Sequence, residues 1–189
     1  MAIRDIKIVV GGTEKSWGYT WAYPGGDNAK EWYKIPAYTM TVSGKDDADK
    51  AQSKTFEVFR FGVKQDKGKP KSNARVVGLA DKQDYAIEMW LPEYKVHSAA
   101  SSEVGAWKVT GNFLVHDGPE DPRSDTAGPF ATVGCIELCG AKQFDALNDF
   151  IISLSGAKGT RAEQLNKIGT SGKLHIYYEK AARPPLTPK

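Results

Sequence analysis

The sequence is poor in cysteine and has no long apolar run. Only two cysteines, Cys135 and Cys139, occur among its 189 residues, and this count excludes a scaffold of several disulfide bridges. The sequence still allows a single disulfide between these two cysteines. No stretch approaches the roughly 20 apolar residues that a membrane-spanning helix needs, so we expect no membrane span.

The sequence also lacks a block of like charge. Its 26 basic and 23 acidic side chains leave a net charge of +3, and the lysines lie among acidic residues. This pattern gives no reason to expect nucleic acid as a partner. The charged residues 64–71 are explained more simply as a solvated hairpin than as a binding patch. The mild basicity would suit an anionic polymer such as a cell wall, although many unrelated proteins share it.

The N-terminal segment lacks the apolar core of a secretory signal, because Arg4, Asp5 and Lys7 interrupt it. We therefore expect synthesis in the cytoplasm without a signal peptide. The length of the chain and the absence of repeats or linkers fit a single domain. We expect this domain to span residues 1–182. Residues 183–189 should form an extended tail, because prolines prevent a strand or helix there.

Along most of the chain apolar residues recur with period two, which is the pattern of β-strands. Turn-forming residues separate these stretches at 23–28, 44–47 and 64–71. The predicted strands are Ile6–Val10, Tyr38–Val42, Glu57–Val63, Tyr85–Leu91, Phe113–Val115 and Leu174–Tyr178.

One segment has helical spacing instead. Its apolar residues recur every three or four positions, at Phe144, Leu147, Ile151 and Leu154. Gly156 is placed to cap the end of this helix. The predicted fold class is therefore β-rich, mainly β with one amphipathic helix.

The residues with the clearest chemical potential are His116 and Cys135. His116 ends a predicted strand and is followed by Asp117 and Gly118, and a loop rich in Pro, Asp and Gly leads to Gly134 and Cys135. A neighbouring histidine favours the nucleophilic thiolate. We therefore expect the two side chains to meet and the pKa of the Cys135 thiol to lie below its ordinary value of about 8.5. Gly134 would let a substrate carbonyl approach, with nearby N–H groups facing the oxyanion.

Residues 116–118, residues 133–138, the amphipathic helix and the final strand together resemble the L,D-transpeptidase (YkuD-like) catalytic domain. The resemblance covers residues 107–180. It implies an L,D-transpeptidase-like β-sandwich that cuts and rejoins peptidoglycan stem peptides through a cysteine acyl-enzyme, as a transpeptidase or an L,D-carboxypeptidase. No cofactor or metal is implied.

The same resemblance assigns roles to single residues. Cys135 would be the nucleophile and His116 its proton acceptor. Gly134 would belong to the oxyanion pocket, with Gly118 and Asp117 in the oxyanion and substrate-binding region.

Two positions depart from the pattern of that family, which commonly has Ser/Thr-His before Gly-Cys and an arginine two positions after the cysteine. This chain has Thr132-Val133 and Glu137 there. We include Glu137 among the substrate-binding candidates. Because it replaces a cation, it removes a partner for a substrate carboxylate. The substrate preference and the balance between transfer and hydrolysis therefore stay open.

Peptidoglycan lies outside the cytoplasm, so an enzyme without a signal peptide needs another route to it. The resemblance extends to peptidoglycan-targeting effectors of the type VI secretion system, some of which have a small residue before Gly-Cys. It implies export to a target periplasm, with a secretion-system carrier and an immunity protein as partners. A phage-associated wall enzyme would follow the same logic.

Each candidate also has a purely structural interpretation. Cys135 could be a small buried apolar residue, and His116 could cap a turn. Cys139 is better explained as buried structure. Asp117 should point away from the imidazole, because adjacent strand residues face opposite sides. A backbone carbonyl is therefore the better candidate to orient His116.

The other histidines and the tryptophans have weaker signals. His97 and His175 belong to no metal-ligand spacing. Tryptophans are more often core residues than surfaces on which a sugar ring stacks. We nevertheless expect one or two of them to line the groove that binds the substrate. The five are Trp17, Trp21, Trp32, Trp90 and Trp107.

Two classes of function stay open. One is a cysteine peptidase or transpeptidase acting on peptidoglycan. The other is a non-enzymatic β-sandwich module, binding or structural, in which Cys135 is inert. A papain-like or NlpC-type amidase is disfavoured, because those enzymes place the cysteine before the histidine in sequence.

Overall fold

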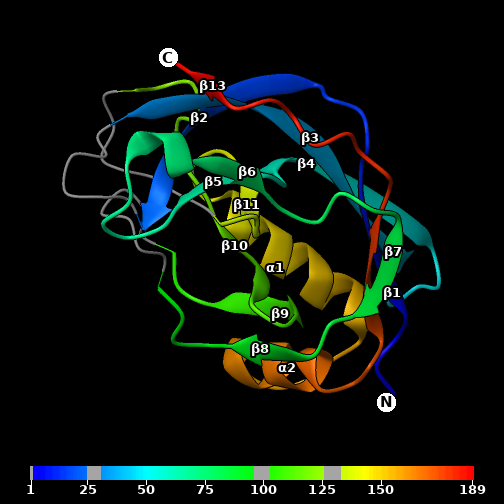
Figure 1. Cartoon of the computed structure of the whole chain (residues 1–189). Coiled ribbons are helices and arrows are strands. Elements are labelled where there is room, and N and C mark those ends of the chain that lie inside the picture. The colour runs from blue at the N-terminus through cyan, green and yellow to red at the C-terminus, as the bar shows by residue number, and fades with distance from the viewer. Residues whose placement is uncertain (1, 25–30, 96–102, 126–132) are drawn as a thin grey trace.

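β-strands are the main regular structure of the chain, as the period-two pattern predicts (Figure 1). The computed structural model describes residues 2–24, 31–95, 103–125 and 133–189. The first strands are β1 (Ile6–Val10), β2 (Ser16–Pro24), β3 (Trp32–Lys45), β4 (Ala51–Phe59), β5 (Gly62–Gln65), β6 (Arg75–Val77), β7 (Gln83–Ala86) and β8 (Met89–Leu91). There follow β9 (Ala106–Thr110), β10 (Phe113–Asp117), β11 (Ile136–Leu138), helices α1 (Gln143–Ser155) and α2 (Arg161–Gly169), β12 (Leu174–Tyr178) and β13 (Thr187–Pro188).

The β-rich fold class is confirmed, whereas a sandwich like that of the resembled family stays a prediction. The strands form a mixed sheet in the order β6-β5-β2-β3-β4-β11-β10-β9-β8. The long strand β3 joins a second branch, in which β1 pairs with β3 and β12, and β12 pairs with β7. One half of β3 pairs with β2 and the other with β1 and β4. In Figure 1 the curved sheet surrounds α1.

The main core lies between the sheet and α1. β1 buries Ile6, Ile8 and Val10, and α1 buries the predicted apolar stripe between Phe144 and Leu154. The helix ends at Gly156 as predicted, and its φ of 71° is the left-handed conformation that glycine adopts readily. α1 packs against β1, β3, β4 and β10, so it anchors a strand that bears one of the candidate site residues.

The expectation of a single helix is wrong, because Arg161–Gly169 form a second one, α2. Its start is fixed by a capping box. The Thr160 side chain accepts from the Glu163 backbone N–H, and the Glu163 carboxylate accepts from the Thr160 N–H. Leu165 and Ile168 are the only large apolar side chains that α2 buries, so its apolar stripe is too short to stand out by period.

Two predicted strands are each divided in the structure. Residues 57–63 contribute to β4 and β5, which are separated by Arg60 and Phe61. Residues 85–91 contribute to β7 and β8, which pair with different partners, β12 and β9. Period-two alternation continues through both breaks, so it does not reveal the change of partner.

The first break coincides with a buried arginine. Arg60 is fully buried, and its Nη1 donates to the carbonyl oxygens of Gly11 (2.8 Å) and Glu179 (3.0 Å). Its Nη2 donates to the carbonyl oxygen of Leu79 at 2.6 Å. The guanidinium therefore holds three separate segments together, a role that a regular strand residue does not have.

In the described part of the chain, five strands form where the sequence predicts none, namely β2, β6, β9, β11 and β13. β2 runs antiparallel to the first half of β3. The C-terminal tail is extended, but Thr187 and Pro188 pair with Lys34 and Tyr33 of β3. The tail is thus attached to the sheet, which corrects the expectation that no strand forms there.

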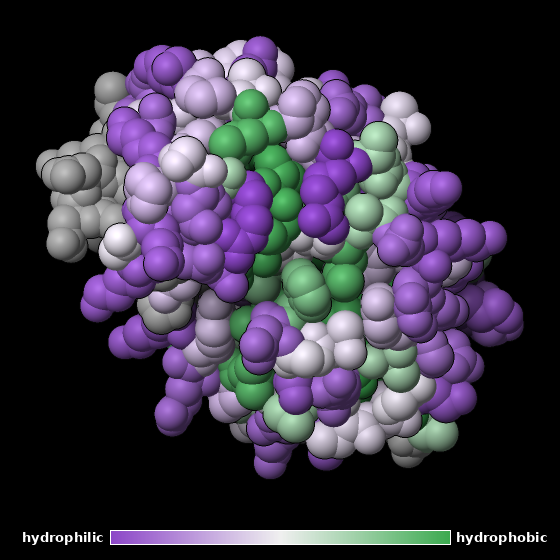
Figure 2. Space-filling view, in the orientation of Figure 1, coloured by the Kyte–Doolittle hydropathy of each residue, from purple (hydrophilic) through white to green (hydrophobic). Residues whose placement is uncertain are grey.

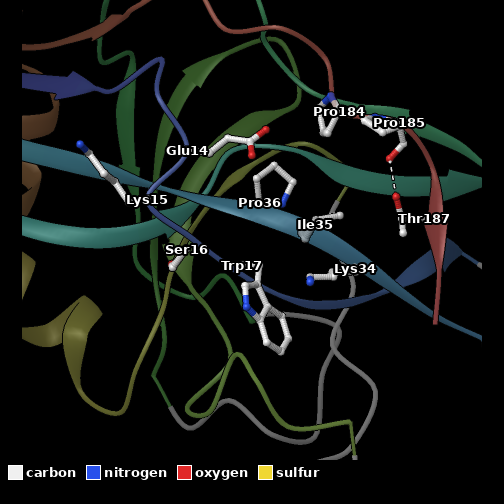
Figure 3. Close-up of a pocket in the computed structure, with 10 residues that line it drawn as sticks. All are labelled: Glu14, Lys15, Ser16, Trp17, Lys34, Ile35, Pro36, Pro184, Pro185 and Thr187. Carbon is white, nitrogen blue, oxygen red and sulfur yellow. Dashed lines mark hydrogen bonds between the residues drawn. The ribbon is translucent and has the colours of Figure 1, made fainter.

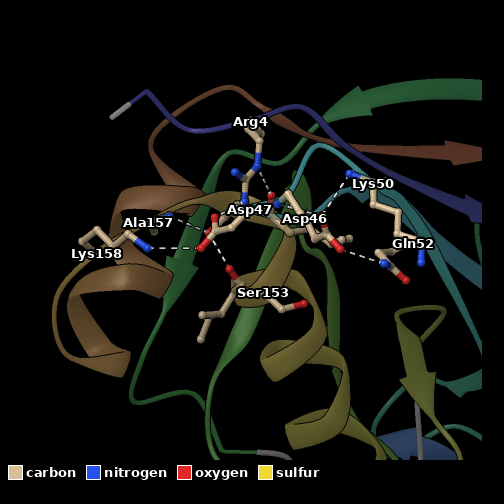
Figure 4. Close-up of polar contacts among 12 residues, drawn as sticks. Arg4, Asp46, Asp47, Lys50, Gln52, Ser153, Ala157 and Lys158 are labelled. Atoms are coloured by element: carbon tan, nitrogen blue, oxygen red, sulfur yellow. Dashed lines mark hydrogen bonds and ion pairs between the residues drawn. The ribbon is translucent and has the colours of Figure 1, made fainter.

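The turn between β3 and β4 is tied to the helical side of the molecule (Figure 4). Asp47 accepts from Arg4 at 2.7 Å and from Lys158 at 3.3 Å. Asp46 accepts from the backbone N–H groups of Ala48 and Lys50, which closes the turn. These hydrogen bonds lower the pKa of both carboxyl groups.

Neither helix in the described residues is long and apolar enough to cross a membrane. On the face of the molecule seen in Figure 2, an apolar band lies in a hollow between hydrophilic borders. Among the described residues the most exposed large apolar side chains are Trp17, Met89, Val104 and Leu186.

Candidate functional site

His116 and Cys135 lie on the same face of the sheet because β10 and β11 are parallel neighbours. The register pairs Val115 with Ile136 and His116 with Glu137. Paired residues project from the same face of a sheet, and so do residues two positions apart in one strand. His116, Glu137 and Cys135, which directly precedes β11, therefore share a face.

A backbone carbonyl orients the imidazole, as expected. His116 Nδ1 lies 2.6 Å from the carbonyl oxygen of Asp117. Because a carbonyl only accepts, Nδ1 carries the hydrogen, and Nε2 is the basic nitrogen of the neutral ring. Nε2 lies 3.9 Å from Oε1 of Glu137. The ring of Tyr94 packs at 5.5 Å, centroid to centroid, from that of His116.

Cys135 is more enclosed than a ready nucleophile would be. It is 5% exposed and belongs to a small apolar cluster with Ala106 and Leu114, against which Tyr94 packs. Its thiol donates to the carbonyl oxygen of Asn112, with an Sγ–O distance of 3.7 Å. The thiol hydrogen is thus held within the protein.

The prediction of a lowered thiol pKa is wrong for this arrangement. Burial raises the pKa of Cys135 to about 12, and the negative charge of Glu137 raises it further. A backbone hydrogen bond from Leu114 acts in the opposite direction but does not compensate. The thiol is therefore neutral at physiological pH, so a mechanism must remove its proton during the attack.

The carboxyl group of Asp117 contacts Glu103 on the other face of the strand. Burial raises the pKa of Glu103 to about 7, and its hydrogen bond with Asp117 raises it too. Two carboxyl groups form such a bond only when one holds a proton. Glu103 Oε1 also accepts from the backbone N–H of Asp145 at 2.8 Å, so the pair connects β10 to the first turn of α1.

Both predicted glycines lie where backbones touch. A Cβ on Gly134 would be 2.5 Å from Cα of Gly78, and its φ of +95° is a conformation that favours glycine. A Cβ on Gly118 would be 2.2 Å from the carbonyl oxygen of Leu138. Close packing is therefore sufficient reason for glycine at both positions. The predicted roles in oxyanion and substrate binding stay predictions.

The remaining candidates lie elsewhere. Cys139 is buried in a separate apolar cluster, as expected, and no disulfide joins it to Cys135. His175 lies on β12, and its Nδ1 is 3.5 Å from Oδ1 of Asp84. His97 and Thr132 fall outside the described residues. Within the described ranges, no three His, Cys, Asp or Glu side chains are grouped to hold a metal ion.

Sequence reasoning missed Tyr94 and Glu103. Burial raises the pKa of Tyr94 to about 12, with the charges of Cys135 and Glu137 as further causes, so this phenol stays protonated beside the pair. Neither residue lies in a motif of the sequence. Both residues precede β9 in sequence. They lie near β10 because β9 pairs with β10 in the sheet.

No protein-family model, curated protein or solved structure matches the chain. Function therefore has to be inferred from the side chains of the site.

Proposed function

We propose that this protein cleaves peptidoglycan stem peptides through an acyl-enzyme on Cys135, as a transpeptidase or an L,D-carboxypeptidase. One observation carries the proposal: Cys135 and His116 share one face of paired parallel strands, and a backbone carbonyl already orients the imidazole. The choice of peptidoglycan rests on the resemblance of the motifs to L,D-transpeptidases.

The neutral thiol defines the first step. Substrate binding turns the Sγ–H of Cys135 away from Asn112 and toward Nε2 of His116. As sulfur attacks the peptide carbonyl, the proton passes to Nε2, so the thiolate forms only during the attack. The C–N bond then breaks, and the imidazolium returns the proton to the leaving amine.

The second step releases the acyl group from the thioester. Water or an amine loses a proton to Nε2 of His116 and attacks the thioester carbonyl, and the departing sulfur regains a proton. Water gives hydrolysis, and an amine gives transpeptidation. The Tyr94 hydroxyl is a protonated donor close to the pair, and it is suited to stabilise negative charge on the carbonyl oxygen.

Digestion of purified sacculi tests this activity. Wild-type protein should release or exchange stem-peptide residues, detected by mass analysis of the muropeptides. Cys135→Ala and His116→Ala should abolish the change. Cys139→Ala is the matched control, because it removes the other buried thiol and should retain activity. Equal activity in Cys135→Ala would refute the proposal.

The burial and raised pKa of Cys135 favour a second candidate, a non-enzymatic module in which this thiol is inert. In that case Cys135 contributes packing alone. Cys135→Ala would then leave every effect on sacculi unchanged and lower the free energy of unfolding by about 1 kcal/mol or more, as removal of a buried side chain does.

Delivery to the wall forms part of the proposal, because mature peptidoglycan lies in the periplasm. We propose a secreted antibacterial effector with a carrier and an immunity partner. The wild-type chain fused to a secretory signal should lyse or round a Gram-negative host, whereas the same fusion with Cys135→Ser should not. Equal toxicity without the added signal would contradict a periplasmic target.

A further inference from the structure

Four aromatic rings follow one another along β2 and β3. Trp17, Tyr19 and Trp21 alternate along β2, and Trp32 of β3 is paired with Trp21. Centroids are 5.3 Å apart for Trp17 and Tyr19, 6.3 Å for Tyr19 and Trp32, and 5.3 Å for Trp21 and Trp32. We call these four residues the aromatic stripe.

The stripe lies on the outer face of β2. The intervening residues Gly18 and Thr20 are buried, and a Cβ on Gly18 would meet the ring of Phe59. Trp17, in contrast, is 38% exposed. Large exposed aromatic rings often mark binding surfaces, because their apolar faces gain from being covered.

A pocket of about 440 Å³ opens beside Trp17. Figure 3 shows its walls, where Ser16 and Trp17 of β2 face Lys34 of β3, and Pro184 and Pro185 of the tail close one side. This volume is in the range of sites for small ligands. The pocket thus combines an apolar ring with hydroxyl and ammonium groups.

Two lysine ammonium groups lie over rings of the stripe, and one of them, that of Lys189, is also paired with Asp125. Lys34 Nζ lies 4.4 Å from the Trp17 ring centroid, and Lys189 Nζ lies 5.5 Å from that of Tyr19. Lys15 and Glu14 also line the pocket. The surface therefore suits a ligand that has apolar faces and also carries hydroxyl and carboxylate groups.

The stripe is continuous with the segment that follows β10. The backbone N–H of Tyr19 donates to the carbonyl oxygen of Pro122 at 2.8 Å. Pro122 belongs to the chain that leaves His116 toward Cys135. A long polymer bound along the stripe would therefore run past a segment connected to the candidate site.

We propose that the aromatic stripe and its pocket bind the glycan strand of peptidoglycan, with a sugar ring stacked on Trp17. Sugar rings present an apolar C–H face to an aromatic ring and hydroxyl groups at their edge, and the acidic groups of the polymer meet Lys15 and Lys34. This inference rests on the proposed function. A proline-rich peptide fits less well, because it has no acidic groups for these lysines.

Binding is tested in the Cys135→Ala background, so that no bond is cut. The probes are a peptide-free oligomer of alternating N-acetylglucosamine and N-acetylmuramic acid, which carries free carboxylates, followed by tryptophan fluorescence, and whole sacculi, followed by sedimentation. Trp17→Ala should weaken both by about tenfold, as loss of a central aromatic contact does, and Trp17→Phe should restore part of it. Circular dichroism checks that both variants are folded.

Tyr177→Ala is the matched control. Tyr177 is a partly buried ring on β12 with two lysine ammonium groups nearby, Lys7 at 5.3 Å and Lys82 at 5.9 Å, but it lies outside the stripe. The Tyr177→Ala variant should bind the sugar oligomer as tightly as the parent protein does. Equal weakening in both variants, no binding of the oligomer, or a response to a proline-rich peptide alone would overturn the inference.

Catalysis separates this inference from the proposed function. With the Cys135 thiol present, Trp17→Ala should keep the parent rate on soluble stem peptides and lose rate on sacculi. Sugar binding that depends on Trp17, without any cleavage by the parent, would reject the proposed catalysis and leave the glycan surface standing. Equal loss on soluble peptides and sacculi would reject a glycan-specific role.

Discussion

The strand pairs β10–β11 and β2–β3 place their distinctive side chains in opposite surroundings. On the first pair His116 is 3% exposed and Cys135 is 5% exposed, whereas Trp17 on the second is 38% exposed. Burial raises the pKa of the Cys135 thiol. Exposure allows a long polymer to reach the aromatic rings. The molecule therefore separates the enclosed candidate pair from the exposed aromatic stripe.

The largest expected difference between interior and surface concerns stability. Arg60→Ala should lower the free energy of unfolding by about 3 kcal/mol or more, because it leaves a cavity and three carbonyl groups without their donor. Trp17→Ala should cost less than about 1 kcal/mol, since Trp17 is partly exposed. Urea denaturation measures both. Similar losses in the two variants would contradict the assignment of Arg60 to the structural interior.

An intermediate effect is expected on the reactivity of Cys135. In a Cys139→Ala background, Glu137→Gln should lower the pKa of Cys135, because it removes a negative charge that raises it. The pKa should stay above its ordinary value, since burial is the larger cause. Alkylation at pH 8 should rise by up to about tenfold, the change that one pKa unit makes.

Iodoacetamide labelling followed over a range of pH gives this pKa directly. Glu88→Gln is a suitable control, because Glu88 is paired with Lys108 at 2.7 Å and does not contribute to the Cys135 pKa. A Cys135 pKa below its ordinary value in the parent protein would mean that the site is more open than described.

The smallest effect concerns Glu103. Its pKa is raised to about 7 in the folded protein, so the stability from its protonated form is complete below its ordinary pKa of 4.5 and is lost as the pH rises through about 7. Glu103→Gln should mimic that form and raise Tm by about 2–4 °C at pH 8.5 relative to wild type. At pH 5 the difference should nearly disappear. A gain that is equal at both pH values would rule out the shared proton.

The spacing of apolar residues in the sequence predicts the strands and the helix that bury one regular face. β1, α1 and β12 follow from apolar periodicity, and Gly156 ends α1 because a left-handed conformation is needed there. Arg60 interrupts a predicted strand and donates hydrogen bonds to residues that are distant in sequence. The spacing of apolar residues does not reveal such long-range contacts. α2 could have been found from the capping box of Thr160 and Glu163, even though its apolar stripe is short.

The candidate site was predictable in its residues but not in its environment. Glycine before Cys135 and the residues after His116 indicate the pair, and the opposite facings of adjacent strand residues indicate the carbonyl that orients the imidazole. The parallel pairing of β10 and β11 is set by the whole sheet. The burial that raises the thiol pKa comes from packing by Leu114 and Tyr94, which the local motif does not contain.

Intact-protein mass spectrometry of a trapped intermediate tests the central claim most directly. Wild-type protein and Cys139→Ala, mixed with a soluble stem peptide and quenched in acid, should each gain the mass of one acyl group. Peptide mapping should place it on Cys135 as a thioester that hydroxylamine removes. Cys135→Ala should gain nothing, and His116→Ala should acylate far more slowly. An adduct that forms on Cys139, or cleavage of stem peptides that persists in Cys135→Ala, would contradict a Cys135 acyl-enzyme.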